Sequence, residues 1–324
     1  MPRFDVTIAG ELNLDLILYG LPKELPEERE LLAQRMTLTL GSSSAIVAHN
    51  LAALGCRVGF VSRIGDDPLG QIALGRLAAS GVDVSRIRVA EGETKTGLTV
   101  ILQRQRVRNI LTYPGTIFDL TLADLDFDYL TDASHFHLSS FYLQRGLRAR
   151  VGELFRKLKA SGLTISLDTN DDPEDTWGGG LMDVLQYVDV FLPNARELKR
   201  IAGTDDFESA LAQIAREVPL LVVKRGEEGA LARRGREQIA MPAVGVKLVD
   251  PVGAGDSFDA GFLSQFVRGS DLRTCLGWAN LAGALSTTQP GGTEAFRNRE
   301  AMEAFFREHG QESRSGTTRP AEPG

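Results

Sequence analysis

The residues best suited to chemistry are two glycines and an alanine that lie directly before an aspartate. They are Gly253, Ala254, Gly255 and Asp256, and apolar residues at helical spacing follow over 258–267. Small residues at a helix start let backbone N–H groups converge on an anion, and the positive helix end keeps a carboxylate ionised. Such a carboxylate can accept a hydroxyl proton while the N–H groups hold a phosphoryl group. The loop therefore predicts phosphoryl transfer, with a turn in which Asp256 only caps a helix as the alternative.

The segments that must position this loop alternate between strand and helix. Strand-like runs are predicted over 6–9, 57–62, 163–167, 188–192 and 220–223, and a further strand over 246–249 should lead into the loop. Helical patterns are predicted over 44–54, 67–79, 147–160, 196–201 and 207–217. This alternation predicts a mostly parallel sheet covered by helices.

Two regions, about 12–40 and 96–113, depart from this alternation. Their apolar residues recur with period two, which predicts a small, mainly antiparallel sheet that forms a lid over a site on the main domain. Three arginines, Arg104, Arg106 and Arg108, alternate there and would share one face of a strand. That face would either recognise an acidic substrate or be a solvated hairpin surface. The lid strands are expected to pair across a homodimer.

Composition excludes several classes of protein. The chain has 324 residues with a net charge of −7, which argues against a nucleic-acid partner or an anionic membrane. Cys56 and Cys275 are the only cysteines and form no CxxC motif, as expected of reduced thiols in a cytoplasmic protein. We expect no signal peptide and no transmembrane span. Residues 1–308 are predicted to form the domain, and 309–324 a polar, flexible tail.

The loop lies within a longer motif, Asp-Pro-Val-Gly-Ala-Gly-Asp-Ser-Phe-Asp-Ala-Gly-Phe-Leu, over 250–263. This motif resembles the C-terminal signature of the ribokinase-like (PfkB) family of carbohydrate kinases, and the resemblance covers about 4–305. It implies a Rossmann-like three-layer α/β/α domain with a small β-sheet lid. It also implies transfer of the γ-phosphate from ATP with Mg²⁺ to an alcohol group of a sugar-like molecule, with Asp256 as base.

The resemblance further implies roles for residues outside the loop. Asp15 would contact substrate hydroxyls. Asn194 and Glu197 would organise the Mg²⁺–phosphate end of ATP, and Lys224 and Gly226 would belong to a nucleotide-phosphate loop. Asn280 would line the adenine pocket, which Gly291 and Gly292 would close. Asp250 and the Val252 carbonyl would hold a monovalent cation such as K⁺. Plainer alternatives are a turn cap at Asp15, a surface charge at Lys224, and a capping box formed by Asn194 and Glu197.

The segment that resembles the family's N-terminal signature departs from it. Gly41 fits, but Ser42 replaces a second glycine, and Ile46 stands where the family has an asparagine that bonds a sugar hydroxyl. An isoleucine cannot make that bond, so the substrate would lack this hydroxyl or present it differently. Within the family, a nucleoside substrate is the alternative, because Ile46, Phe141 and Tyr142 could suit a base.

Two other classes of protein stay open. Ser43 lies between a predicted strand and a helix, and with His135 or His137 it could act as the nucleophile of a hydrolase. A sugar-binding regulator that has lost turnover is the other. A P-loop enzyme is excluded because the chain contains no GxxxxGK[ST] motif.

Overall fold

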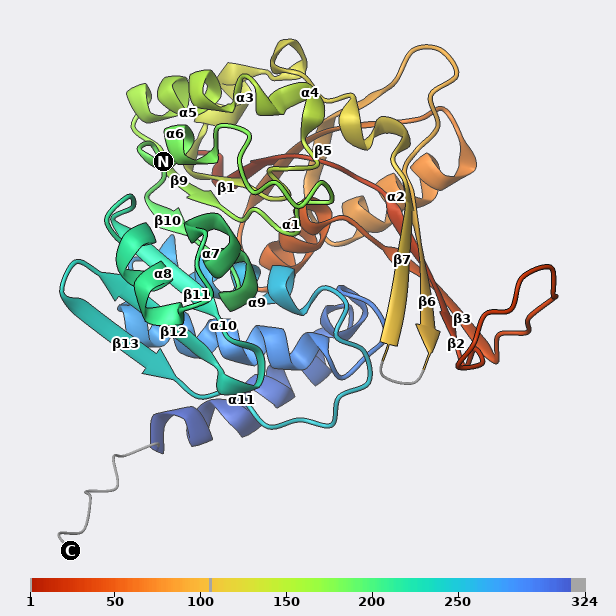
Figure 1. Cartoon of the computed structure of the whole chain (residues 1–324). Coiled ribbons are helices and arrows are strands. Elements are labelled where there is room, and N and C mark those ends of the chain that lie inside the picture. Colours follow the sequence, from red (N-terminus) through yellow and green to blue (C-terminus); the bar gives the residue numbers. More distant parts are fainter. Residues whose placement is uncertain (1, 105–106, 316–324) are drawn as a thin grey trace, which may run out of the picture.

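The computed structural model describes residues 2–104 and 107–315, which form a large sheet, its covering helices and a smaller sheet (Figure 1). The large sheet has nine strands in the order β13-β12-β11-β10-β9-β8-β1-β4-β5. Their bounds are β1 Phe4–Ala9, β4 Val58–Ile64, β5 Asp83–Val89, β8 Ala133–Leu138, β9 Thr164–Leu167, β10 Val190–Phe191, β11 Leu220–Lys224, β12 Ala230–Arg234 and β13 Glu237–Met241. The strands from β11 to β5 pair in parallel, and β12 and β13 add an antiparallel edge.

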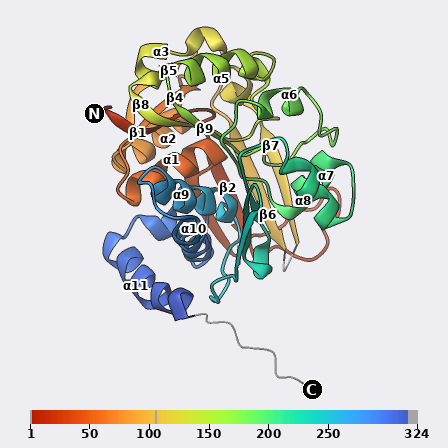
Figure 2. The ribbon, with the colours of Figure 1, turned by 90° about the vertical axis from the view of Figure 1, so that its left-hand side faces the viewer.

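Helices cover both faces of this sheet (Figures 1 and 2). One face packs against α1 Ser43–Ala53, α2 Pro68–Ala79, α9 Ala254–Phe266, α10 Leu272–Ser286 and α11 Arg299–Ser315. The other packs against α3 Phe127–Thr131, α4 Arg145–Arg148, α5 Val151–Ala160, α6 Leu181–Leu185, α7 Ala195–Ala202 and α8 Phe207–Ile214. Short 3-10 helices are η1 Gly115–Phe118, η2 Leu122–Asp124, η3 Gly226–Glu228 and η4 Glu294–Phe296. The three-layer α/β/α architecture is confirmed.

Strand alternation produces these two cores. In β11, Leu220 and Val222 face one helical layer, while Leu221 and Val223 face the other. Because successive side chains of a strand point to opposite faces, a strand covered on both sides must be apolar at every position. Short apolar runs in the sequence therefore predicted the central strands correctly.

The second sheet is the predicted lid. Its strands β2 Leu14–Tyr19, β3 Arg35–Leu40, β6 Leu98–Arg104 and β7 Val107–Tyr113 follow the order β3-β2-β6-β7. The two hairpin pairs are antiparallel, whereas β2 and β6 pair in parallel. Figure 1 shows this sheet projecting beside the main domain, with β1 leading directly into β2. The first residues of β2 consequently lie at the junction of the two sheets.

Three local expectations are wrong. Residues 246–249 form no strand, so an extended loop leads into α9. Arg104 ends β6 whereas Arg108 lies in β7, so these arginines do not follow one strand; Arg106 lies outside the described residues. The helix α11 continues to Ser315, so the domain boundary predicted at residue 308 falls within a helix. Among the described residues, no helix is long and apolar enough to cross a membrane.

Candidate active site

The loop before α9 is held in a conformation that only glycine adopts easily. Gly253 caps α9 with φ at +72°, in the left-handed region. A Cβ atom there would lie 2.4 Å from the Cα of Gly292, so a second segment of backbone closes on the loop. The chain has glycine here both for its φ angle and for this close approach.

This loop presents backbone donors at the start of α9. The Ala254 N–H donates to the Pro251 carbonyl at 3.3 Å. The N–H groups of Gly255 and Asp256 have no acceptor in the described part of the chain, as expected in the first turn of a helix. The anion-binding loop predicted over 253–256 therefore has two unpaired N–H donors, and a third, that of Ala254, already makes a long hydrogen bond.

Asp256 lies in the first turn of α9 and is 8% exposed. Burial raises the pKa of its carboxyl group to about 6, and the negative charge of Asp168 adds to the rise, whereas the Lys224 charge and hydrogen bonds from Ser43 and Asn170 oppose it. The carboxylate is ionised at neutral pH and still basic enough to take a proton. This combination is typical of a general base.

A second buried carboxylate faces the same space. Asp15, near the start of β2, is 6% exposed, and burial together with the charges of Asp256 and Asp250 raises its pKa to about 7. A Cβ atom on Gly41 would lie 2.1 Å from Asp15 Oδ1, so the glycine leaves room for this carboxylate. Ser42 caps α1 and donates to the Glu11 carbonyl at 2.8 Å. The structure therefore brings Asp15, Gly41 and Ser42 together, as predicted.

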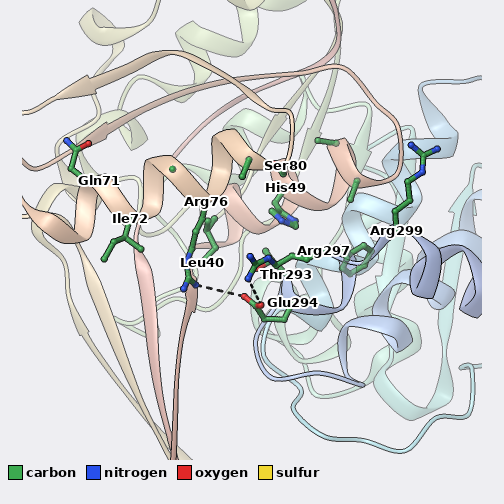
Figure 3. Close-up of a pocket in the computed structure, with 15 residues that line it drawn as sticks. Leu40, His49, Gln71, Ile72, Arg76, Ser80, Thr293, Glu294, Arg297 and Arg299 are labelled. Carbon is green, nitrogen blue, oxygen red and sulfur yellow. Dashed lines mark hydrogen bonds and ion pairs between the residues drawn. The ribbon is translucent and has the colours of Figure 1, made fainter.

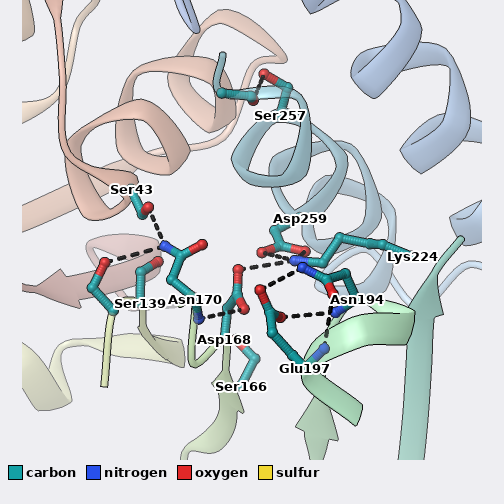
Figure 4. A network of polar contacts seen from close by, with 12 residues as sticks. Ser43, Ser139, Ser166, Asp168, Asn170, Asn194, Glu197, Lys224, Ser257 and Asp259 are labelled. Carbon is teal, nitrogen blue, oxygen red and sulfur yellow. Dashed lines mark hydrogen bonds and ion pairs between the residues drawn. The ribbon is translucent and has the colours of Figure 1, made fainter. Parts of the chain in front are cut away.

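A buried lysine connects three elements of the main domain (Figure 4). Lys224 at the end of β11 donates to Asp168, which follows β9, at 2.9 Å and to Asp259 in α9 at 3.1 Å. Burial lowers the pKa of this lysine, but the two carboxylates outweigh burial and raise it. Burial likewise raises the pKa of Asp168, but the Lys224 ammonium and hydrogen bonds outweigh it and lower the pKa overall. Burial raises the pKa of Asp259. Lys224 is therefore not a solvated surface charge.

Sequence reasoning missed Asp168 and Asn170, which follow strand β9. Asn170 adopts a positive φ of 52° and donates through Nδ2 to Ser43 and, at 3.2 Å, to Ser140 (Figure 4). Because the carboxyl ends of parallel strands meet at one edge of the sheet, polar residues immediately after β9 are candidates for the site. That position was the available signal.

The predicted pair Asn194 and Glu197 forms a capping box at the start of α7. Asn194 Oδ1 accepts from the Glu197 N–H at 2.9 Å, and Glu197 Oε2 accepts from the Asn194 N–H at 2.9 Å. Glu197 is nevertheless 5% exposed, and burial, with the Asp168 charge, raises its pKa to about 7. The alternative of a capping box is thus correct, and the Glu197 carboxylate also lies beside the cluster of Lys224 and Asp168.

A cavity of about 590 Å³ adjoins these groups. Its walls include Lys224, Gly226, Gly255, Phe258, Asn280 and the loop 243–248. Asn280 Nδ2 donates to the Pro242 carbonyl at 2.8 Å, which fixes its orientation. The volume is within the range of small-molecule sites, and one end reaches the start of α9, so the cavity can hold a nucleotide with its phosphates at the helix. Gly292 lies against Gly253 instead, and Gly291 lies against Thr39 of β3. Neither glycine lines this cavity, which corrects their predicted place.

The fit to a magnesium ion follows from the acidic groups. Within the described ranges, no three His, Cys, Asp or Glu side chains are placed to hold a metal ion. Mg²⁺ at nucleotide sites keeps several waters and takes one or two carboxylates plus phosphate oxygens. Glu197, beside the phosphate end of the cavity, satisfies that smaller demand, so these residues fit Mg²⁺ bound together with ATP.

The predicted monovalent-cation residues are firmly positioned. Asp250 is 2% exposed and accepts from Tyr19 at 2.6 Å, from the Val252 N–H at 3.0 Å and from the Gly291 N–H at 3.1 Å. Asp250 therefore links the lid strand β2, the loop before α9 and the segment at 291. The bond from the Val252 N–H fixes the backbone of the loop directly before α9.

Two predicted substrate residues lie elsewhere. Ile46 is 3% exposed, and its Cδ1 packs against Gly253 and Gly292, where added Cβ atoms would lie 3.3 and 2.7 Å away. Ile46 therefore supports the loop before α9 by packing against its backbone. Arg108 is exposed and pairs with Gln103, four residues along β6 from the Thr99 that faces Asp15. At about 3.3 Å per residue, this separation is about 13 Å.

The geometry excludes the hydrolase alternative. His135 and His137 in β8 are fully buried, and both bond the hydroxyl of Ser166 at 2.7 Å. Burial lowers the pKa of each imidazole to about 3. Ser43 bonds Asn170 instead, so no serine–histidine pair is assembled there.

Comparison with known proteins shows which family the chain belongs to. Residues 3–299 match the family described as pfkB family carbohydrate kinase. The 2-dehydro-3-deoxygluconokinase of Bacillus subtilis (strain 168) is 29% identical over 279 residues, which cover 82% of this chain and 86% of that protein. The ATP-dependent ribose-1-phosphate kinase of Halopiger xanaduensis is 30% identical over 307 residues, which cover 94% and 98%.

Solved structures show the same fold. An E. coli protein assigned as a ribokinase II, crystallised with ATP and Mg²⁺, superposes with a TM-score of 0.83 at 26% identity, covering 94% of this chain and all (100%) of that one. The sequence match and the shared architecture agree, and the chain belongs to the pfkB family of carbohydrate kinases.

Proposed function

We propose that this protein transfers the γ-phosphate of ATP to an alcohol group of a sugar or a sugar-like small molecule. One observation carries the proposal: Asp256 and Asp15 are buried together beside the unpaired N–H groups at the start of α9. Neither carboxylate forms an ion pair with any described residue. Two buried acceptors without a cation suit a ligand that supplies hydroxyl donors.

In this mechanism each group has one task. Asp15 accepts hydrogen bonds from substrate hydroxyls and orients the attacking alcohol. Asp256 accepts the proton of that alcohol as the oxygen attacks phosphorus. The N–H groups of Gly255 and Asp256 stabilise the charge on the transferring phosphoryl group, with Gly253 setting the loop geometry and Ala254 contributing its N–H if the bond to Pro251 opens. The proton therefore passes from the alcohol to Asp256 while the bond to ADP breaks.

The nucleotide lies in the cavity lined by Gly226, Asn280 and the 243–248 loop. Lys224, at the phosphate end, approaches the anion hole, because an added Cβ on Gly255 would be 3.8 Å from Lys224 Nζ. Asn194 keeps Glu197 in place through the capping box. Bound Mg²⁺ neutralises phosphate charge and orients the phosphates.

The charge around Asp15 favours a neutral polyol over a sugar acid. Asp15, Asp256 and Asp250 concentrate negative charge, and Arg108 is distant along the lid. A nucleoside stays the alternative substrate, because proteins similar to this chain include a cytidine kinase. Phe141 and Tyr142 are 0% and 1% exposed within the core and Ile46 packs against the loop, so these three residues do not offer a surface for a base. The regulator alternative would leave the buried base Asp256 without a task.

The proposal includes a monovalent cation, such as K⁺, bound near Asp250 and the Val252 carbonyl. The support is the three hydrogen bonds that fix Asp250 between the loop and the lid. If so, replacing K⁺ by a large organic cation should lower kcat without abolishing ATP binding. Equal turnover in both salts would remove the cation from the proposal.

The proposal also includes a homodimer formed through the lid. The edge strand β7 exposes Val107, Ile110, Leu111 and Tyr113 by 60, 57, 55 and 54%, and exposed apolar edge strands are commonly covered by a partner. Ile110→Arg should shift the mass measured by light scattering from dimer to monomer. A wild-type monomer would contradict the dimer.

The proposal places the protein in the cytoplasm. ATP and Mg²⁺ are available there, and the two buried free thiols, Cys56 and Cys275, suit a reducing compartment.

The decisive experiment measures ADP release from ATP and Mg²⁺ with neutral sugars, sugar acids, sugar phosphates and nucleosides, with and without K⁺. Strong turnover on neutral sugars is the expected result. Turnover only on nucleosides or on sugar acids would correct the substrate class. ATP binding without turnover on any compound would favour the regulator, and failure to bind ATP would overturn the proposal.

A further inference from the structure

A second cavity, of about 600 Å³, lies between α1, α2 and the segment from Thr293 to Arg299 (Figure 3). It shares no lining residue with the nucleotide cavity. None of Asp15, Asp256 and Lys224 lines it either. Its volume is ample for a small metabolite. The cavity is therefore separate from the candidate active site, and nothing in the phosphoryl-transfer mechanism uses it.

The lining of this cavity is positively charged although the chain is acidic. Arg76, Arg297 and Arg299 line it against a single carboxylate, Glu294. Arg297 Nη1 bonds Glu294 at 2.9 Å, Arg76 Nη1 lies 3.9 Å from it, and Arg299 bonds Glu303, outside the lining, at 2.8 Å. Guanidinium groups match phosphate and carboxylate oxygens in geometry as well as charge. An anionic ligand fits this lining.

A buried imidazole supplies a second, independent polar group. Asn50 Nδ2 donates to Ser257 Oγ at 2.9 Å and to the Gly292 carbonyl at 3.0 Å, so Asn50 Oδ1 faces His49 as an acceptor. His49 Nδ1, 2.8 Å from that oxygen, must then carry the proton. Burial lowers the pKa of His49, which leaves Nε2 as an acceptor.

This acceptor has no partner inside the protein. His49 is 5% exposed and lines the cavity, and no described residue bonds its Nε2. Nε2 is not sealed from solvent but opens into the cavity, so a ligand hydroxyl can donate to it in place of water and be held in a defined direction. The lining is therefore complementary to a molecule that carries both an anionic group, for the arginines, and a hydroxyl, for His49.

We propose that this cavity is a binding site for a small phosphorylated polyol, with its phosphate at Arg76 and Arg297, which both lie beside Glu294, and a hydroxyl at His49 (Figure 3). Arg299, at the rim, adds positive charge. The inference stands apart from the proposed kinase function, because it concerns binding at other residues.

The site is connected to the lid. Glu294, which holds Arg297, also accepts from Thr39 Oγ1 at 2.9 Å, and Thr39 lies opposite Asp15 in the β2–β3 ladder. Arg76 donates to the Leu38 carbonyl of β3 at 2.6 Å. A phosphate that draws Arg76 and Arg297 toward itself would change both contacts with β3. Occupancy is expected to change the KM for the sugar by about fivefold or more, the usual range of coupling between sites.

Titration calorimetry with glycerol 3-phosphate tests the binding. The protein is first saturated with Mg²⁺ and a non-hydrolysable ATP analogue, whose γ-phosphate fills the anion hole and keeps the probe out of it. Saturable binding to one site is expected, and propyl phosphate, which lacks hydroxyls, should bind at least several-fold more weakly. The His49→Phe variant should bind the two probes alike.

Two arginine variants decide the location. The double variant Arg297→Gln/Arg299→Gln should weaken glycerol 3-phosphate binding about tenfold or more, whereas Arg307→Gln, an exposed arginine outside the cavity, should bind as the wild type does. No saturable binding to the wild type, or equal binding by the double variant and the Arg307 control, would overturn the site. A sugar KM that is unchanged by saturating glycerol 3-phosphate would overturn the coupling to the lid.

Discussion

Replacing Asp256 by asparagine should abolish turnover and at the same time stabilise the fold. The substitution keeps the shape of the side chain but removes the base, so kcat should fall by about 10³ or more. The backbone N–H groups and the nucleotide cavity remain, so ATP should bind almost as tightly as it binds the wild type. Loss of a group that acts only in the transition state lowers kcat rather than substrate affinity.

The gain in stability follows from the pKa of the carboxyl group. Burial, with the charge of Asp168, raises it from 3.8 to about 6, against the opposing Lys224 and two hydrogen bonds. Since a tenfold change in a proton equilibrium corresponds to about 1.4 kcal/mol, ionised Asp256 destabilises the folded state by about 3 kcal/mol at neutral pH. Asparagine is never charged, but it keeps fewer of the hydrogen bonds from Ser43 and Asn170. The net gain should therefore be about 1–3 kcal/mol.

The gain must also depend on pH in a defined direction. A carboxyl group whose folded-state pKa is raised costs nothing below the unfolded pKa of 3.8, and the cost grows until the pH passes about 6. The electrostatic part of the advantage of Asp256→Asn should therefore be nearly constant above about pH 7, about half as large near pH 5, and about a fifth as large near pH 4. The pKa of Asp15, raised in part by the Asp256 charge, should fall in the variant.

Denaturant unfolding from pH 4 to 8, with ADP release and ATP-analogue binding on the same samples, tests these expectations. Asp205→Asn, at an exposed aspartate, is the matched control and should change neither stability nor turnover. An Asp256→Asn variant with near-normal turnover would remove Asp256 from its role as base. A variant that is inactive but less stable than the wild type at pH 8 would refute the argument from burial.

Three further predictions concern the same site. Lys224→Met leaves Asp168 and Asp259 buried without their cation and should lower the free energy of unfolding by about 3–5 kcal/mol, measured by denaturant titration. Gly253→Ala places a Cβ atom 2.4 Å from backbone at a φ of +72°, so kcat and thermal stability should both fall in activity and melting assays. The kcat/KM of the wild type should fall tenfold per pH unit below about pH 6, where Asp256 becomes protonated, in a pH–rate profile.

Matched variants separate these effects from general damage. Lys157→Met removes an exposed lysine that pairs with Glu153 and should cost little, because exposed ion pairs contribute little. Gly235→Ala has a positive φ of 58° but no atom within 4 Å of the added Cβ, so it should cost less than Gly253→Ala. Equal losses for the members of either pair, or a flat kcat/KM down to pH 5, would contradict the corresponding prediction.

Much of the fold could be predicted from local patterns. The run 220–223 had to be a doubly covered strand because every position is apolar, and the structure has β11 there, Leu220–Lys224. The spacing of Asn194 and Glu197, three positions apart, offered a capping box as the plainer alternative, and the structure has that box. In contrast, residues 246–249 look like a strand but pair with no neighbour in the sheet, since apolar composition does not provide a partner.

The candidate site divides in a similar way. The glycines and Asp256 are adjacent in sequence, so their chemistry depends on one turn and one helix end and could be recognised without a structure. The sequence did not show that Ile46 would pack against Gly253, because that contact depends on the distant segment around Gly292, which folds back against the loop. It also could not place Arg108 at the far end of the lid, since Arg104 ends β6 whereas Arg108 lies in the antiparallel strand β7.

By itself, then, the sequence determined the α/β alternation, the lid and the loop with its base, because each is encoded in residues close together along the chain. Only the tertiary structure decided that Lys224, Asp168 and Asp259 form one buried cluster beside Asp256. These residues come from different strands and a helix, and their charges become tolerable only when parallel strands end at a common edge. The pKa of Asp256 depends on that burial and on those neighbours, so its basicity is a property of the assembled fold.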